Sequence, residues 1–176
     1  TITTGELELT HIDPLIVGKD SDVLLVSALS CNSEGTDPVD LAIFKKANVT
    51  NLKLPTTTKR FPFTEDRKRE SAFTKIDGKS TIVTKGAPET IFNMTDMPLE
   101  QKTIWLAKTS KWAKDGHKVL ACAKKELSSE NESLGKELDS GFQFMGLLAF
   151  GGPPRPEVAT AVEYAYKNQI KVLMLT

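Results

Sequence analysis

The sequence has 176 residues, of which 23 are Lys or Arg and 23 are Asp or Glu, and apolar residues make up 39% of it. This length suits one domain, or one domain with a fragment of another. The formal net charge of zero argues against a nucleic-acid binder, which normally carries excess positive charge, so any anion site must be local.

The pattern of apolar and polar residues predicts a strand, two helices and then mainly strands. Asp20-Ser21-Asp22 is expected to cap the first helix, and Asp37 before Pro38 the second. Asp77-Gly78 predicts a hairpin turn, and Gly116 the end of a long helix. The expected strands are 6–12, 60–63, 71–76, 80–85, 119–123, 142–150 and 170–175. The expected helices are 23–31, 38–47, 90–94, 99–115 and 157–168.

Several segments carry further expectations. The helix 99–115 is expected to bury Ile104, Leu106 and Trp112, and the charged, Ser-rich segment 124–140 to be a mobile loop. The helix and strand of 157–175 have the alternation typical of a parallel sheet. No stretch approaches the roughly 20 apolar residues of a membrane span.

The two cysteines indicate reduced thiols and no metal site. Cys31 and Cys122 lie in separate apolar runs, and the chain has only two histidines. A structural zinc site is therefore not expected.

The standard phosphate loops and hydrolase nucleophile turns are absent, because the sequence contains no GxxxxGK(S/T), GxGxxG, HExxH or GxSxG. Lys85-Gly86-Ala87-Pro88-Glu89 lies where a strand is expected to lead into a helix. Small residues there let a flat ligand approach the backbone, and the lysine and helix N-terminus favour an anion. A strand-to-helix turn with a solvated lysine is the alternative.

Two other segments have the composition of a nucleotide site. Phe61 and Phe63 precede Arg67-Lys68-Arg69, and exposed aromatics beside cations suit a stacked base whose phosphates meet positive charge. A core phenylalanine followed by a solvated turn is the alternative. In Asp37-Pro38-Val39-Asp40, helix capping explains Asp37 but leaves Asp40 free.

In their order and spacing these segments resemble the cytoplasmic nucleotide-binding domain of P-type cation-transporting ATPases, over essentially the whole chain. KGAPE and a PPRxE-like segment in this order are specific together. The matching segments are Thr1–Gly5 (the end of DKTGT(L/I)T), Asp37–Ala42 (GDPxExAL), Phe63–Lys68 (PFxxxRK), Lys85–Glu89 (KGAPE), Gly116–Ala121 (GxRxLAxA), 153–157 (DPPRxE) and 172–176 (before TGD).

The resemblance implies an α/β (α+β) domain at 6–148, a mainly antiparallel sheet flanked by helices. It implies that 1–5 and 149–176 are pieces of a Rossmann-like, haloacid-dehalogenase-type phosphorylation domain, so both ends are expected to be cuts through a larger protein. That parent is expected to be an integral membrane protein with this domain in the cytoplasm. Its other phosphorylation, actuator and transmembrane parts are the expected partners.

The implied chemistry is ATP hydrolysis through an aspartyl-phosphate, with Mg²⁺ neutralising the phosphates. The nucleophilic aspartate is expected before Thr1, so the isolated chain is expected to be monomeric, to bind ATP or ADP and to be inactive, with no catalytic residue and no metal ligand of its own. The transported cation cannot be read from these residues, although their overall character leans towards the Ca²⁺, Mg²⁺ and H⁺ pumps.

The resemblance also implies individual roles in nucleotide binding. Phe63 would stack on adenine, Asp40 would lie near its amino group, and Gly86 would keep the pocket floor thin. Lys85 is expected to reach its ammonium towards the phosphates. Lys118 stands where the family has an arginine. Gly152 stands where the family has the aspartate of DPPR, so Arg155 matches the arginine of that motif only in residue type. The implied nucleotide-binding residues are Asp40, Phe63, Lys68, Lys85, Gly86, Lys118 and Arg155.

Two other functions are weighed against this one. A non-catalytic interaction module would keep the fold and lose the nucleotide, with the changes at Lys118 and Gly152 as signs of decay. The intact Phe63, Lys85 and Gly86 argue against it. A free-standing phosphatase would need a DxD motif after a buried strand, and Asp20-Ser21-Asp22 is instead followed by an apolar helix.

Overall fold

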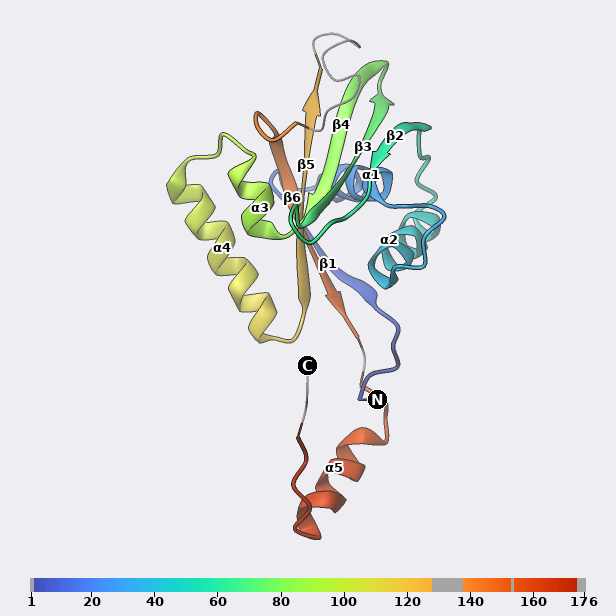
Figure 1. Ribbon diagram of the computed structural model, residues 1–176, viewed down its shortest axis with the longest axis vertical. Helices are drawn as coiled ribbons and strands as arrows, with labels where there is room; N and C mark the ends of the chain where they lie inside the picture. Colours follow the sequence, from blue (N-terminus) through green and yellow to red (C-terminus); the bar gives the residue numbers. More distant parts are fainter. Residues whose placement is uncertain (1, 128–137, 153, 174–176) are drawn as a thin grey trace.

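The computed structural model describes residues 2–127, 138–152 and 154–173. They include a sheet in the order β1-β6-β5-β4-β3-β2, in which all neighbouring strands are antiparallel (Figure 1). The strands are β1 (Glu8–Pro14), β2 (Thr57–Phe61), β3 (Arg69–Ile76), β4 (Lys79–Gly86), β5 (Lys118–Glu126) and β6 (Gln143–Gly151). The helices are α1 (Asp20–Ser30), α2 (Pro38–Val49), α3 (Pro88–Asn93), α4 (Leu99–Lys114) and α5 (Val158–Lys167). The expected antiparallel sheet flanked by helices is confirmed.

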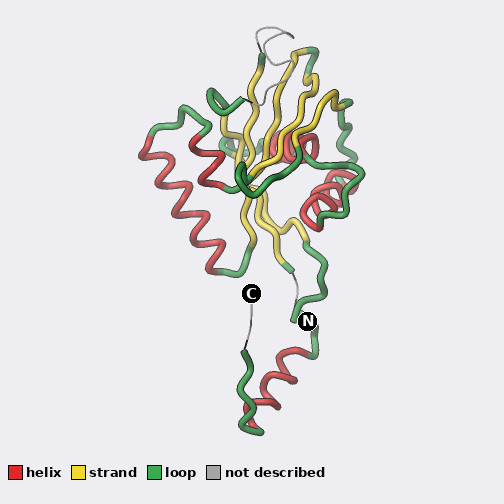
Figure 2. The backbone as a smooth tube through the Cα atoms, viewed as in Figure 1, coloured by secondary structure: helices red, strands yellow, loops and turns green. Residues whose placement is uncertain are grey.

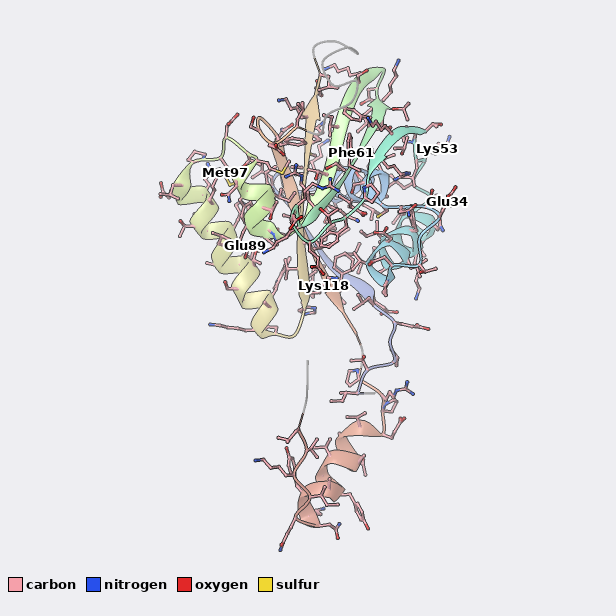
Figure 3. All side chains as sticks on the ribbon, in the orientation of Figure 1. Glu34, Lys53, Phe61, Glu89, Met97 and Lys118 are labelled. Carbon is pink, nitrogen blue, oxygen red and sulfur yellow. The ribbon has the colours of Figure 1, made fainter. Side chains whose placement is uncertain are left out.

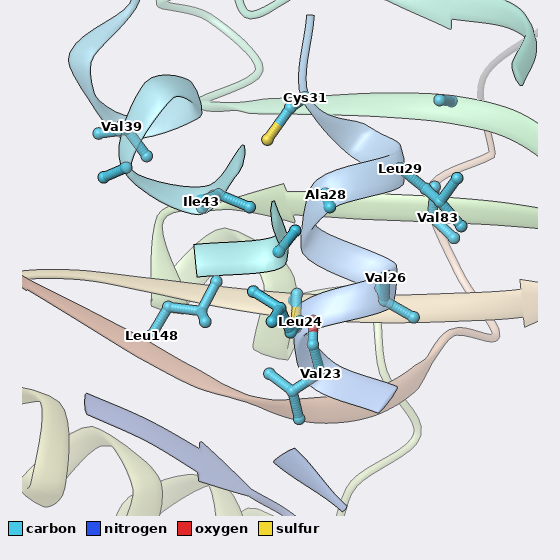
Figure 4. Close-up of a cluster of buried hydrophobic side chains, with 14 of the residues drawn as sticks. Val23, Leu24, Val26, Ala28, Leu29, Cys31, Val39, Ile43, Val83 and Leu148 are labelled. Carbon is cyan, nitrogen blue, oxygen red and sulfur yellow. The ribbon is translucent and has the colours of Figure 1, made fainter. Parts of the chain in front are cut away.

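Helices cover both faces of the sheet, which makes three layers (Figures 1 and 2). One apolar cluster joins α1 and α2 to the sheet, and Figure 4 shows its side chains from α1, α2, β4 and β6. A second cluster joins α3 and α4 to the opposite face. Because both faces are covered, β4 is buried continuously over its last six residues, Thr81–Gly86. In the described part of the chain, no helix combines the length and apolar character needed to cross a membrane.

Local signals in the sequence account for several boundaries. The Asp37 carboxylate accepts hydrogen bonds from the backbone N–H groups of Val39 (2.8 Å) and Asp40 (3.4 Å), which starts α2 as expected. Asp77 and Gly78 both have positive φ, as a two-residue hairpin turn requires. Gly116, with φ of 88°, follows α4.

Three local expectations were wrong. Helix α1 begins at Asp20 itself, and its first-turn carboxylates make no side-chain cap. Strand β2 ends at Phe61, so Phe63 lies in the loop that follows it. On α4, Ile104 is 63% exposed, whereas Trp105 packs edge-on against Phe144 with ring centroids 4.9 Å apart. Leu106 and Trp112, the other two residues expected on the buried side, are half-buried and pack against the second cluster, so the expectation was wrong at Ile104 alone.

The segment before β1 lies beside the segment that leads into α5 (Figure 2). Thr3 pairs with Pro154 in an antiparallel bridge, and the Arg155 N–H donates to the Ile2 carbonyl at 2.9 Å. The helix expected at 157–168 is confirmed as α5, but residues 170–173 form no strand, and 174–176 lie outside the described residues. Strand β6 runs through the expected domain boundary at 148/149. Of the expected loop 124–140, the first three residues belong to β5, and 128–137 also lie outside the described residues.

Gly86 is required by the β3–β4 pairing, in which it lies opposite Arg69. A Cβ atom at Gly86 would lie 2.4 Å from the Lys68 carbonyl oxygen and 2.6 Å from the Arg69 Cβ. Gly86→Ala is therefore expected to lower the free energy of unfolding by about 1–3 kcal/mol. Urea unfolding followed by circular dichroism measures this loss. The control is Gly152→Ala, whose nearest contact would be 3.5 Å, and equal stability of the two variants would contradict the prediction.

Candidate nucleotide site

A cavity of about 820 Å³ opens where α2, β4, α3 and β5 meet the loop between β2 and β3. Its size is in the range of small-molecule sites, about 300–1,000 Å³. Six of the seven residues implied by the sequence line it: Asp40, Phe63, Lys68, Lys85, Gly86 and Lys118. Residues from four separate parts of the chain therefore meet at one site.

Phe63 supplies an aromatic surface at the cavity and is 57% exposed. Phe61 differs, because it is half-buried and packs edge-on against Phe73 with ring centroids 5.6 Å apart. Each of the two alternatives, a core phenylalanine and an exposed stacking ring, therefore holds for one residue of the pair. Phe61 is a packing residue on β2, and Phe63 leaves its ring available to a ligand.

Gly86 positions the loop that carries Phe63. The absence of a side chain at Gly86 lets the Lys68 backbone approach, and the Lys68 carbonyl accepts a hydrogen bond from the Ala87 N–H at 2.9 Å. Lys68 itself has φ of 51° and donates its N–H to the Thr64 carbonyl at 2.8 Å. Gly86 therefore acts mainly by holding the 62–68 loop against the end of β4, in addition to lining the cavity.

Cationic side chains line the outer part of the cavity. Lys68 follows the Phe63 loop, and Lys118 begins β5; both are exposed (Figure 3 labels Lys118). An exposed ammonium keeps most of its hydration and can meet an anion at little cost. This edge suits the phosphate groups of a ligand.

The inner wall holds a buried ion cluster of Lys85, Asp40 and Glu70. Lys85 is 4% exposed, and its Nζ lies 2.8 Å from Asp40 Oδ1 and also pairs with Glu70 Oε1. The Asp40 Oδ2 accepts a hydrogen bond from the Asn32 N–H at 2.9 Å. The expectation that the Lys85 ammonium reaches towards phosphates is corrected, because two carboxylates hold it in the wall.

Glu70 was missed by reasoning from the sequence, although a signal was present. The hairpin turn at Asp77-Gly78 fixes the register of β3 and β4, and this register places Glu70 directly opposite Lys85. Opposite charges across neighbouring strands attract one another. Counting back from the turn would have paired the two residues.

Cys31 lies beside this cluster, and its Sγ, one Asp40 oxygen and one Glu70 oxygen lie within 4.8 Å of one another. Burial raises the pKa of the Cys31 thiol, and the Asp40 carboxylate raises it further against the lowering effect of Lys85. A protonated thiol is a poor metal ligand, and the Lys85 ammonium already pairs with both carboxylates. These three side chains therefore do not fit a metal ion.

Arg155 is the one implied residue that the structure does not bring to the cavity. Its Nε donates to the Thr3 carbonyl at 3.1 Å, and its side chain borders a separate hollow with Ile2 and Val158. Its role in nucleotide binding stays a prediction.

The same stretch of chain that forms the cavity matches a known family. Residues 36–157 match the family described as "P-type ATPase, cytoplasmic domain N". The chain belongs to this family. The match includes six residues of the site, from Asp40 to Lys118, and Arg155 as well.

Whole proteins with a similar segment are longer than this N domain. This chain is 26% identical over 198 residues to Calcium-transporting ATPase 1 of Lactococcus lactis, and the match covers 99% of this chain and 22% of the relative. It is 27% identical over 160 residues to Calcium-transporting ATPase 1 of Saccharomyces cerevisiae, covering 80% of this chain and 17% of the relative. The chain thus spans about a fifth of the curated relatives it matches.

A solved structure shares the fold. The crystal structure of a zinc-transporting PIB-type ATPase matches with a TM-score of 0.58 and 19% identity, over 100% of this chain and 24% of that one. At this identity the likeness supports the N-domain architecture alone.

Lys85→Met tests the buried ion cluster, because it leaves the Asp40 and Glu70 carboxylates facing one another without a cation. Removing one partner of a buried ion pair lowers stability by about 3–5 kcal/mol. Urea unfolding at neutral pH measures the change. Lys79→Met is the matched control, since Lys79 lies on the same strand and pairs with Glu126 at 2.8 Å on an exposed surface. That control is expected to change little, and a similarly small effect of Lys85→Met would contradict the buried cluster.

Proposed function

We propose that this N domain binds ATP in the cavity, with the adenine ring stacked on Phe63. The observation that carries the proposal is the 57% exposed Phe63 ring on the wall of a cavity of about 820 Å³. A largely exposed phenylalanine ring that faces a nucleotide-sized space offers a stacking surface.

Charge along the cavity supports one orientation of the nucleotide. The exposed Lys68 and Lys118 suit the phosphates, and the buried carboxylate of Asp40 lies on the inner wall. Carboxylates accept hydrogen bonds, so an exocyclic amino group such as that of adenine is the suitable neighbour there. This supports the proposal that the base lies inside and the phosphates lie towards solvent.

The proposal extends to the whole protein that contains this domain. We propose an ATP-driven cation pump, an integral membrane protein with this domain in the cytoplasm, that passes through an aspartyl-phosphate. Its phosphorylation, actuator and transmembrane parts would be the partners of this chain. The 176 residues contain no DKTG motif, so the proposal gives them ATP or ADP binding, as a monomer, without phosphoryl transfer. The names of the calcium-transporting relatives favour Ca²⁺ as the cation.

Phe63→Ala is expected to remove the stacking surface. Stacking of a base on an aromatic ring contributes about 1–3 kcal/mol. We expect the isolated chain to bind ATP with a dissociation constant on the order of 0.1–1 mM, roughly 4–5.5 kcal/mol. The loss should therefore abolish measurable binding of ATP, ADP and AMP alike in a calorimetric or chemical-shift titration.

Phe61→Ala is the matched control for this test, two residues earlier and outside the cavity lining. Because Phe61 is half-buried against Phe73, its loss should lower stability by about 1–3 kcal/mol and leave ATP affinity near that of the wild type. Circular dichroism first confirms that both variants fold. If folded Phe63→Ala binds ATP as the wild type does, the proposed pocket is wrong and the interaction-module hypothesis is favoured.

Binding of ATP by this chain should depend little on Mg²⁺. The whole protein is proposed to use Mg²⁺ with ATP, but among the described residues the candidate metal group, Cys31, Asp40 and Glu70, is occupied by the Lys85 ammonium. Titration of ATP in EDTA and in excess Mg²⁺ should give affinities within about tenfold, or roughly 1.4 kcal/mol. A larger loss in EDTA would reveal metal ligands that this account does not contain.

A further inference from the structure

We infer that Glu70 determines how the site responds to the phosphate charge of its ligand. Together with Asp40 it holds the Lys85 ammonium in the inner wall and leaves that wall with a net negative charge, which repels phosphates from the inner end of the cavity. The inference rests on the proposed nucleotide site and assigns to it a residue that the sequence motifs do not include.

The contacts show that Lys85 is divided between two carboxylates. Its Nζ pairs with Asp40 Oδ1 at 2.8 Å and with Glu70 Oε1, and both the Lys85 and Asp40 side chains are about 95% buried. The remaining Asp40 oxygen accepts the Asn32 N–H. An ammonium held from two sides has little freedom to leave the wall for a phosphate in the cavity.

The formal charges of Lys85, Asp40 and Glu70 give the cluster a net negative charge. Two carboxylates and one ammonium leave one negative charge, and the Glu70 side chain, 12% exposed, borders the cavity. Interactions of buried charges are weakly screened by solvent. A triphosphate therefore meets repulsion at the inner wall and attraction at Lys68 and Lys118, both of which are exposed at the outer edge.

Glu70 is the member of the cluster that can be changed with least damage to the pocket. In Glu70→Gln the Lys85–Asp40 ion pair at 2.8 Å stays, and the amide keeps the shape of the side chain. The wall becomes formally neutral. A role in packing alone would change the affinities for adenosine and ATP equally, whereas a charge role changes the affinity for ATP and spares adenosine.

The experiment compares adenosine, AMP, ADP and ATP in EDTA at low ionic strength, by chemical-shift titration of wild type and Glu70→Gln. We expect Glu70→Gln to bind ATP about threefold to tenfold more tightly, with a smaller gain for AMP and none for adenosine. Raising the salt concentration should reduce the gain for ATP, because screening weakens the charge effect.

Two further variants make the comparison specific. Glu34→Gln removes the same charge from an exposed residue that does not line the cavity (Figure 3), so the ratio of ATP to adenosine affinity should stay at the wild-type value. Asp40→Asn removes a charge from the other side of Lys85 and should raise that ratio, as Glu70→Gln does. It also keeps the test available if Glu70→Gln does not fold.

The outcomes separate this inference from the proposed function. If wild-type chain binds neither ATP nor adenosine, the proposed function fails. If wild type binds both, but folded Glu70→Gln and Asp40→Asn leave the ratio of ATP to adenosine affinity unchanged or lower it, the nucleotide site stands and the role of Glu70 is overturned.

Discussion

The ion cluster of Lys85, Asp40 and Glu70 is the constraint on which the site depends. It joins the start of α2 to the β3–β4 hairpin, at the end of β4 and the start of β3. Buried charges are tolerated only when each has a partner, because desolvation of an unpaired ion costs several kcal/mol. The cluster therefore ties the position of α2 to the sheet, and with it the loop and helix start that form one wall of the cavity.

A second constraint is the close approach at Gly86, the residue that follows Lys85 on β4. The Lys68 backbone packs against Gly86, and its carbonyl accepts the Ala87 N–H at 2.9 Å. This contact fixes the end of the loop that carries Phe63. The aromatic ring is exposed while the backbone that presents it is anchored, an arrangement that limits the entropy lost when a ligand binds.

Features with a local cause could be predicted from the sequence. Turns and caps such as Asp77-Gly78 and Asp37 depend on neighbouring residues, and both were predicted correctly. The burial expected of Ile104 on α4 was wrong, because tertiary packing decides which apolar residues of a weakly amphipathic helix are buried. In the site, the motifs brought six residues together. The pair of Lys85 with Glu70 follows from the register of the β3–β4 hairpin, whereas its pair with Asp40 depends on the docking of α2, which neighbouring residues do not determine.

We propose that adenine lies on the Phe63 ring in this cavity, whose inner wall holds the Lys85 cluster. The most direct test is an isotope-filtered nuclear Overhauser experiment on the labelled chain with unlabelled ATP. We expect contacts from the adenine H2 and H8 protons to the Phe63 ring, and none to Phe61. Contacts to Ile2 and Val158 at the separate hollow near α5, or to Phe61 in place of Phe63, would contradict it.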